Sequence, residues 1–329
     1  MPEPHRFGVI ALSGPPNAGK STLLNRIIGE KISIMSRRAQ TTRHRILGIK
    51  TLAAAQLVFV DTPGLQRRPP KGLNRVINRT ALNSLADVDL ILFMIDGRGW
   101  TPELEQLFAQ VARAGRAAGA GAAGGANANG DGGANVNADS NSAPVILLIN
   151  KIDRLKDRAR LLPIIKHSAE LHPFKQIIPI SARKFSDVDN FLNLIAAELP
   201  EGGPGFPADQ FTDRSQRFLA AELVREQTLN LLGHELPYAS AVEVTRFEYR
   251  GDNLLHVAVI VWVEKTSQKS IVIGRGGRQL KAIGQAARKQ MEKAFGVQVY
   301  LEPWVKVQSG WAGNAAMLRT LGYLEEERA

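Results

Sequence analysis

The sequence predicts an α/β domain with a doubly wound, mostly parallel sheet, followed by a smaller α+β domain. Three observations support this prediction. The chain has 329 residues, more than one typical core holds. Short runs of Val, Ile and Leu alternate with helical segments over the first 200 residues. The Pro/Gly-rich stretch PEGGPGFP then precedes a region with another order of elements. We therefore expect domains at 1–200 and 208–329, joined by a linker at 201–207.

Five apolar runs in the first domain read as buried strands, and each ends in polar or turn-forming residues. They are FGVIALSG, AQLVFVDTPG, VDLILFMIDG, PVILLINKID and KQIIPISAR. An open α/β sheet binds its ligand where such strands end. The second domain reads as a helix, two strands, a helix and a strand, at 213–232, 240–250, 254–264, 277–294 and 297–307.

One segment, 114–143, interrupts the alternation, because it is nearly all Ala, Gly and Asn. It buries too little apolar surface to offset its ordering entropy, so we expect a disordered insertion. A helix continuing through 109–122 is the alternative. The segment lies before the strand PVILLIN, at the sheet edge away from the ligand, so we expect it to leave the site untouched.

Composition excludes several classes of function. There is no cysteine, so disulfides, thiolate catalysis and Cys-ligated zinc are excluded. We find no secretory signal and no apolar run long enough to span a bilayer, so we expect a cytoplasmic protein. The net charge of +11 favours a polyanionic partner. Lys and Arg concentrate at 31–79, beside the single Asp61, and at 264–293; a solvated basic face is the alternative.

The stretch GPPNAGKS, 14–21, matches the phosphate-binding pattern G-x-x-x-x-G-K-[ST] between a strand and a helix. Backbone N–H groups of 17–21 would surround a β-phosphate at the helix N-terminus. Lys20 would bridge the β- and γ-phosphates, and the Ser21 hydroxyl would ligate Mg²⁺. This motif specifies a nucleoside triphosphate without specifying the base.

Three further motifs follow in order. In DTPG, Asp61 would hold the Mg²⁺ shell, and the Gly64 N–H would reach the γ-phosphate; a strand-end turn is the alternative. In NKID, Asp153 offers two acceptors to guanine N1–H and its 2-amino group, which adenine lacks. In SAR, the Ala182 N–H would donate to guanine O6. The predicted nucleotide contacts are Gly14, Pro15, Pro16, Asn17, Ala18, Gly19, Lys20, Ser21, Thr22, Asp61, Thr62, Pro63, Gly64, Leu65, Asn150, Lys151, Ile152, Asp153, Ser181 and Ala182.

These motifs resemble those of the translation-factor-like GTPases, and SRRAQTTRHRILG at 36–48 narrows the resemblance to the Era family. The resemblance implies a P-loop GTPase in which Thr42, or Thr41, closes over Mg²⁺. With Leu65 where many GTPases carry a water-orienting glutamine, it implies slow intrinsic hydrolysis. Asn17 looks like the residue through which related GTPases bind K⁺. The expected catalytic residues are Asn17, Lys20, Thr42 and Gly64, and the expected metal ligands are Ser21, Thr42 and Asp61.

A second glycine loop, VIGRGG, carries G-x-x-G at 274–277. Alone, it fits any tight corner, but its basic window and its place in an α+β domain resemble a type II KH domain, which binds single-stranded nucleic acid. Ile271, Ile273, Leu280 and Ile283 would floor the groove. The expected RNA contacts are Ile273, Gly274, Arg275, Gly276, Gly277, Arg278, Lys281, Arg288 and Lys289.

The ending LEPWVKVQSGWAGNAAMLRTLGY also resembles the Era C-terminus. Lys306 and Trp311 would extend the RNA contact by charge and stacking; the alternative is that Trp304 and Trp311 are core residues. The family resemblance implies a GTPase that uses GTP and Mg²⁺, with K⁺ as a hypothesis, binds 16S rRNA near its 3′ end and assists small (30S) subunit maturation. It implies a monomer that binds no DNA. The alternatives are a regulator acting on another RNA, or a peripheral role on the inner face of the cell membrane.

Overall fold

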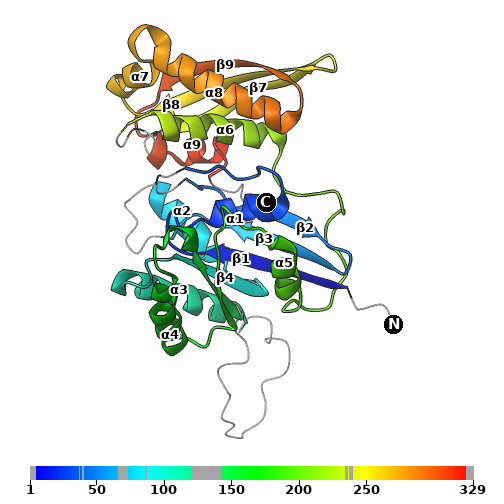
Figure 1. Ribbon diagram of the computed structural model, residues 1–329. Helices are drawn as coiled ribbons and strands as arrows, with labels where there is room; N and C mark the ends of the chain where they lie inside the picture. The colour runs from blue at the N-terminus through cyan, green and yellow to red at the C-terminus, as the bar shows by residue number, and fades with distance from the viewer. Residues whose placement is uncertain are drawn as a thin grey trace, which may run out of the picture. The chain divides into compact units, whose positions relative to one another are not determined.

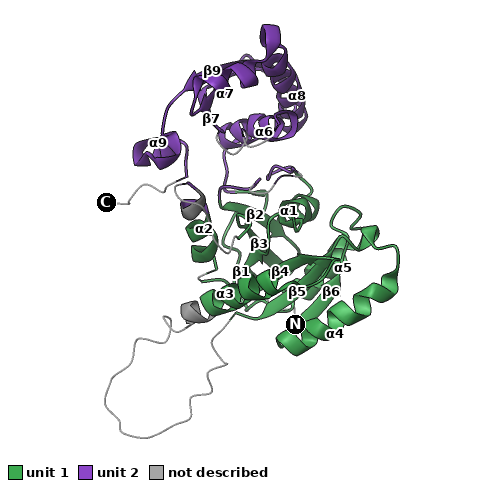
Figure 2. Cartoon of the chain, turned by 90° about the vertical axis from the view of Figure 1, so that its left-hand side faces the viewer, with its two compact units in different colours: residues 1–30, 45–69, 78–212 green, residues 31–44, 70–77, 213–329 purple. Residues whose placement is uncertain are grey.

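The protein is described by a computed structural model covering residues 5–36, 38, 41–65, 73–85, 87–119, 143–233, 236 and 240–323. The chain divides into two compact units (Figure 2). Unit 1 comprises 1–30, 45–69 and 78–212, and unit 2 comprises 31–44, 70–77 and 213–329. The second unit therefore takes in two short segments from the first half of the chain.

Unit 1 is built on a six-stranded sheet in the order β2-β3-β1-β4-β5-β6 (Figure 1; β5 and β6 are labelled in Figure 2). Its strands are β1 (Arg6–Ser13), β2 (Ile46–Thr51), β3 (Ala55–Asp61), β4 (Leu90–Asp96), β5 (Val145–Asn150) and β6 (Gln176–Pro179). All neighbours pair in parallel except β2 and β3. Every residue of β5 is buried, as expected for a parallel strand covered on both faces.

Helices cover both faces of this sheet. The buried side chains of α3 (Pro102–Gly119) pack on β4 and β5, together with Ala81 of α2 (Leu73–Asn83), and α4 (Leu161–Leu171) adds partly buried residues. The helices α1 (Lys20–Ile28) and α5 (Val188–Ala196) pack against β3. The predicted doubly wound α/β fold is confirmed.

Unit 2 holds a three-stranded sheet in the order β7-β8-β9. Its elements are α6 (Gln216–Leu231), β7 (Ser240–Arg250), β8 (Leu254–Val263), α7 (Thr266–Ile273), α8 (Arg278–Phe295), β9 (Gln298–Val307) and α9 (Ala315–Thr320). The strands β7 and β8 are antiparallel, whereas β8 and β9 are parallel and are joined through α7 and α8. One apolar core unites α6, α8 and the inner face of the sheet.

Three elements were absent from the sequence prediction: β2, α7 and the short helix α9. The antiparallel edge strand β2 follows a basic stretch and has no long apolar run. The segment before the second glycine loop is the helix α7, so the order from α6 to β9 is α-β-β-α-α-β. It was missed because eight residues with one buried side chain, Val272, carry almost no helical periodicity.

The Ala/Gly/Asn-rich insertion begins inside α3, which continues to Gly119, and its remainder lies largely outside the described residues. Within the described part of the chain, no helix combines the length and apolarity needed to cross a bilayer.

Candidate functional site

The first glycine loop forms a tight phosphate cradle between β1 and α1. Asn17 has φ 61° and Gly19 φ 113°, so both lie in the left-handed region. A Cβ at Gly19 would stand 2.2 Å from Asn150 Nδ2, so only glycine fits there. The Lys20 ammonium donates to the carbonyl oxygens of Gly14 and Pro15, at 3.0 and 3.1 Å. Burial lowers the pKa of Lys20 to about 8, against the opposing effect of Asp61.

The predicted magnesium ligands of unit 1 lie together. Ser21 Oγ donates to Asp61 Oδ2 at 2.7 Å, and the Asp61 side chain is fully buried at the end of β3. Gly64 follows, and a Cβ there would stand 2.8 Å from Pro16 Cα. The DTPG turn therefore lies directly against the phosphate loop. A hydroxyl and a carboxylate meeting beside a phosphate cradle fit Mg²⁺, which prefers oxygen ligands.

The predicted base-reading residues converge on Asn150. Its Nδ2 donates to Ala18 O at 2.7 Å, and its Oδ1 accepts from the backbone N–H groups of Lys151 (2.7 Å) and Ala182 (2.9 Å). Asn150 thereby ties the NKID and SAR motifs to the phosphate loop. Because the Ala182 N–H already donates to Asn150, a bond to guanine O6 would have to be shared with it.

Asp153 is oriented by the SAR motif. Ser181 Oγ donates to Asp153 Oδ1 at 2.7 Å, and this hydrogen bond holds the pKa of Asp153 below its ordinary value. The carboxylate therefore stays ionised at neutral pH, as its predicted role of accepting the two guanine donors requires. Lys151, at φ 63°, donates through Nζ to Asn17 O at 2.6 Å and so connects the base-reading loop to the phosphate loop.

Asp96, which the sequence reading did not single out, also lies at this edge. Its carboxylate binds Arg98 at 2.6 Å and lies 3.8 Å from Lys151 Nζ. Burial alone would raise the pKa of Asp96, but the hydrogen bonds from Arg98 outweigh it and the pKa is lowered. The sequence did contain a signal for Asp96, because an acidic residue ends the predicted buried strand VDLILFMID.

The residue after the DTPG turn takes no part in the polar site. Leu65 is 1% exposed and packs in the core beneath α2 and α3. An apolar, buried side chain cannot orient an attacking water. Leu65 therefore cannot replace the glutamine that many GTPases carry at this position, because it has no polar group and does not face the site.

Thr42 belongs to unit 2 rather than to the unit that carries Lys20, Ser21 and Asp61. It is 7% exposed, within a segment that bonds to Glu226 and Arg225 of α6. The Arg225 guanidinium donates to Thr41 O, while Thr41 Oγ1 donates to Arg38 O at 2.8 Å. The choice between Thr41 and Thr42 as magnesium ligand stays a prediction.

Basic residues of the same segment are bound within unit 2. Lys31 Nζ pairs with Glu226 at 2.6 Å, Arg38 donates to Leu232 O, and the buried Arg43 donates to Ser240 O at 2.9 Å. These three do not form the open phosphate-binding face that the charge count at 31–79 had suggested. Arg37, Arg67 and Arg68, which share that window, lie outside the described residues.

The second glycine loop has the backbone of a close-approach loop. Gly274, Gly276 and Gly277 have φ of 71°, 61° and 74°, and a Cβ at Gly274 would stand 2.6 Å from Gln279 Cβ. At Gly276 and Gly277 a Cβ would meet nothing within 4 Å, so no other protein atom covers the loop backbone at the positions where those side chains would be. Such a loop lets a nucleic-acid backbone approach the protein closely.

Most of the predicted RNA contacts are presented at the surface of unit 2. Those exposed are Arg275, Gly276, Arg278, Lys281, Arg288 and Lys289, while Ile273, Gly274 and Gly277 are half-buried. One predicted groove residue is placed differently. Ile283 is fully buried in the core of unit 2, because α8 turns that side chain toward α6 and the sheet.

The two tryptophans near the C-terminus differ. Trp311 is fully buried with Leu318 and Tyr323, whereas Trp304 is 58% exposed on β9. Trp311 is therefore a core residue and the prediction that it stacks on RNA is wrong, while the core alternative is wrong for Trp304.

Comparison with known proteins adds independent support. A family model described as 50S ribosome-binding GTPase matches residues 9–118, and a KH domain model matches 235–312. GTPase Era of Xylella fastidiosa strain M12 is 47% identical over 97% of this chain and 98% of its own. GTPase Era of Stenotrophomonas maltophilia strain R551-3 is 45% identical over the same shares.

Two solved structures match over 97% of this chain and 99% of theirs, each at TM-score 0.84 and 37% identity. One is a point variant of Aquifex aeolicus Era bound to GDP·AlF4⁻. The other is Era in complex with MgGDPNP and nucleotides 1506–1542 of 16S ribosomal RNA.

Proposed function

Because the chain belongs to the Era family of GTPases, we propose that it is a GTP-driven switch that binds the 3′ region of 16S rRNA and assists small-subunit maturation. GTP hydrolysis is the family's named activity. The RNA target and the role in assembly are the proposal.

The observation that carries the RNA proposal is the loop at 274–277. Three glycines with positive φ stand at the start of α8, whose exposed side chains include Arg278, Lys281 and Lys289. Such a loop clamps about four nucleotides of a single strand, and the cations neutralise its phosphates. The related Era structure holds a 16S rRNA fragment together with MgGDPNP, which supports the same pairing of ligands here.

In unit 1 we assign the phosphates to the loop at 14–21 and the base to Asp153. Lys20 would pair with the β- and γ-phosphates, and Ser21 and Asp61 would hold Mg²⁺ and its water shell. The bound ion would neutralise charge that develops on the phosphates during transfer. Gly64, pressed against Pro16, would offer its backbone N–H to the γ-phosphate.

With Leu65 buried, we propose slow intrinsic hydrolysis that depends on a further element. K⁺ held through Asn17 is our candidate for that element. The test measures single-turnover GTP hydrolysis in KCl and NaCl, for the natural chain and for Asn17→Ala. Equal rates in the two salts for the natural chain would remove K⁺ from the mechanism.

The proposal as a whole is tested by RNA binding across a salt series. The probe is the 16S fragment 1506–1542, with the protein loaded with either a GTP analogue or GDP. Gly277→Asp is the disrupting variant and Gly277→Asn its uncharged match, since both residues tolerate positive φ. We expect Asp to weaken binding at least tenfold more than Asn does, because its carboxylate would face the phosphates.

Tighter binding with the GTP analogue than with GDP would support a nucleotide-gated clamp. If both Gly277 variants bind as the natural chain does, the RNA does not use this loop and the proposal fails. We further propose that the protein acts as a cytoplasmic monomer, which sedimentation at micromolar concentration would check.

A further inference from the structure

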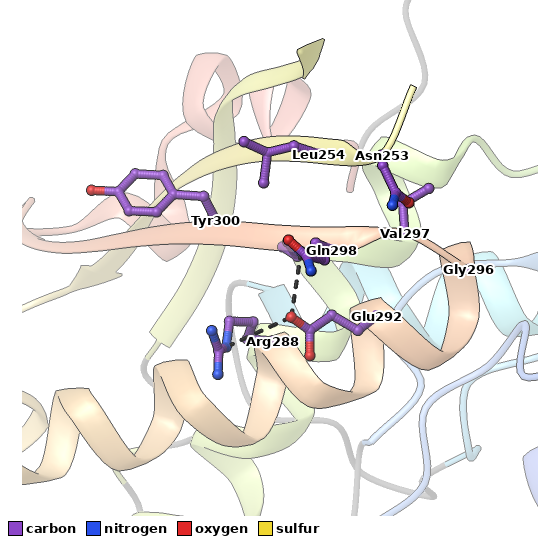
Figure 3. A pocket seen from close by; sticks show the side chains of 9 residues that line it. Asn253, Leu254, Arg288, Glu292, Gly296, Val297, Gln298 and Tyr300 are labelled. Carbon is purple, nitrogen blue, oxygen red and sulfur yellow. Dashed lines mark hydrogen bonds and ion pairs between the residues drawn. The ribbon is translucent and has the colours of Figure 1, made fainter. Parts of the chain in front are cut away.

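A pocket of about 720 Å³ lies in unit 2, at the end of α8 away from the glycine loop (Figure 3). It is lined by Asn253, Leu254, Arg288, Glu292, Gly296, Val297, Gln298, Val299 and Tyr300. Its size falls within the range of small-ligand sites. None of the nucleotide motifs and only one predicted RNA contact, Arg288, belongs to it.

The pocket wall carries one carboxylate, Glu292, and the C-terminal end of α8 as hydrogen-bond acceptors. Glu292 projects from α8 toward the start of β9, where its carboxylate accepts from the Val299 N–H at a long 3.4 Å. Arg288 Nε lies 3.9 Å from the same carboxylate, also a weak contact. Gly296 ends α8 beside the pocket, and carbonyl groups at a helix C-terminus attract donors.

This chemistry disfavours a phosphate and favours a group that presents N–H donors. A carboxylate with long, weak contacts can accept two neighbouring N–H bonds, and the side-chain amides of Asn253 and Gln298 lie at the same pocket. Among the nucleobases, guanine alone carries a ring N–H next to an amino group, the arrangement that two carboxylate oxygens match.

The position of the pocket connects it to RNA. It shares α8 with the glycine loop, and Arg288 lies eleven residues after Gly277, or about 16 Å along the helix axis. A strand clamped at the loop and running along α8 would reach Arg288, whose guanidinium can stack on a base or pair with its phosphate. The clamp itself accommodates about four nucleotides, so any longer RNA needs a further surface.

We propose that this pocket binds a guanine base of the RNA, outside the nucleotides held by the glycine loop, and that the Glu292 carboxylate reads it. The inference rests on the proposed RNA-binding function and names a second contact for the same ligand.

The experiment compares guanine with inosine, which lacks only the 2-amino group. The probe is the 16S fragment 1506–1542 with inosine replacing each guanine in turn, and binding is measured by fluorescence anisotropy. The full chain is saturated with a non-hydrolysable GTP analogue, so the nucleotide site of unit 1 cannot contribute. We expect one guanine whose replacement weakens binding roughly five- to tenfold, the cost of one hydrogen bond to a charged group.

Glu292→Gln is the decisive variant, since a carboxamide offers one acceptor and presents an N–H against the guanine donors. We expect the guanine-to-inosine ratio at that position to fall below about twofold. Removing an acidic group also strengthens binding of any RNA, so the ratio is the readout and not the affinity. Glu248→Gln, at an exposed position on β7, removes the same charge and should keep the ratio of the natural chain.

Two results overturn the inference. One is an unchanged ratio at every guanine in Glu292→Gln. The other is the absence of any sensitive guanine in the natural chain, as expected if the pocket instead serves a peptide strand. If Gly277→Asp still weakens binding in the same assay, the proposed function survives either result. If it does not, the proposed function has failed first.

Discussion

His44 should make the stability of unit 2 depend on pH in a way that one substitution removes. Its ring is 7% exposed, stacks on Tyr323 with 4.5 Å between centroids, and meets the edge of Phe218. Nδ1 lies 3.0 Å from Gly322 O. Burial lowers the pKa of His44 to about 4; nearby Glu222 opposes this shift, while Arg225 and Arg214 add to it.

The direction of the pH dependence follows from comparing how many protons the folded and unfolded states bind. In the unfolded chain the imidazole titrates near 6.5, so between pH 6.5 and about 4 the unfolded state binds more protons than the folded state. The contribution of His44 to the unfolding free energy is therefore fully present above pH 6.5. It falls as the pH drops through this window and changes no further below pH 4. The difference between the unfolded-state and folded-state pKa values of His44 corresponds to roughly 3 kcal/mol of unfolding free energy.

The assay is denaturant unfolding at half-unit steps from pH 7.5 to 4, for the natural chain and for His44→Phe. Phenylalanine keeps the ring stacking and loses the hydrogen bond to Gly322, at a pH-independent cost of about 1 kcal/mol. The difference between the two unfolding free energies should therefore change sign or shrink steadily below pH 6.5. A difference that stays constant from pH 7 to 4 would show that His44 is not held neutral by burial, and the reasoning would be refuted.

Three further outcomes are expected. GTP affinity should fall about tenfold per pH unit above pH 8, since a neutral Lys20 must take up a proton to pair with phosphate; calorimetry at pH 7.5, 8.5 and 9.5 checks this, and constant affinity contradicts it. Asp153→Asn should weaken GTP binding by roughly a hundredfold and favour xanthosine triphosphate, whose 2-oxo group accepts from the amide; competition binding decides. Trp311→Ala should cost about 3–5 kcal/mol of unfolding free energy, whereas the exposed Trp304→Ala should cost below about 1 kcal/mol; similar losses would contradict their different burial.

The nucleotide site was predictable because its parts are local. Each motif combines a strand with a turn at the strand's end, and parallel strands bring those ends to one edge. The position of Lys20, Asp61 and Asp153 at that edge could thus be predicted from spacing alone, and their roles stay predictions. The mutual contacts could not, because a bond such as Asn150 to the Ala182 N–H depends on how two loops meet in space.

The secondary structure of unit 2 was harder to predict from the sequence where its helices are short. The strands β7, β8 and β9 were predicted to within one residue of their observed bounds, and that prediction is confirmed. The helix α7 has eight residues, Thr266–Ile273, and its Ile271 is 56% exposed, so neither apolar periodicity nor burial distinguishes it from an extended segment. The pocket beside Glu292 was invisible for another reason, since it joins the end of one helix to the starts of two strands.

The Lys and Arg count of the sequence overestimated the positive charge that is available to RNA. The burial of some of these side chains changes where RNA should bind. A count of Lys and Arg treats every side chain as exposed, yet Arg43 is 3% exposed and donates within the protein to Ser240 O. Burying a guanidinium is tolerated only when it is paired, so such a residue is committed to the fold and unavailable to phosphates. On α8, by contrast, Lys281 and Lys289 are exposed and have no ion-pair partner among the described residues. The salt dependence of RNA binding should therefore come mainly from α8 and much less from Lys31, Arg38 and Arg43. Only unpaired, solvated cations are available to displace the counterions condensed on RNA phosphates.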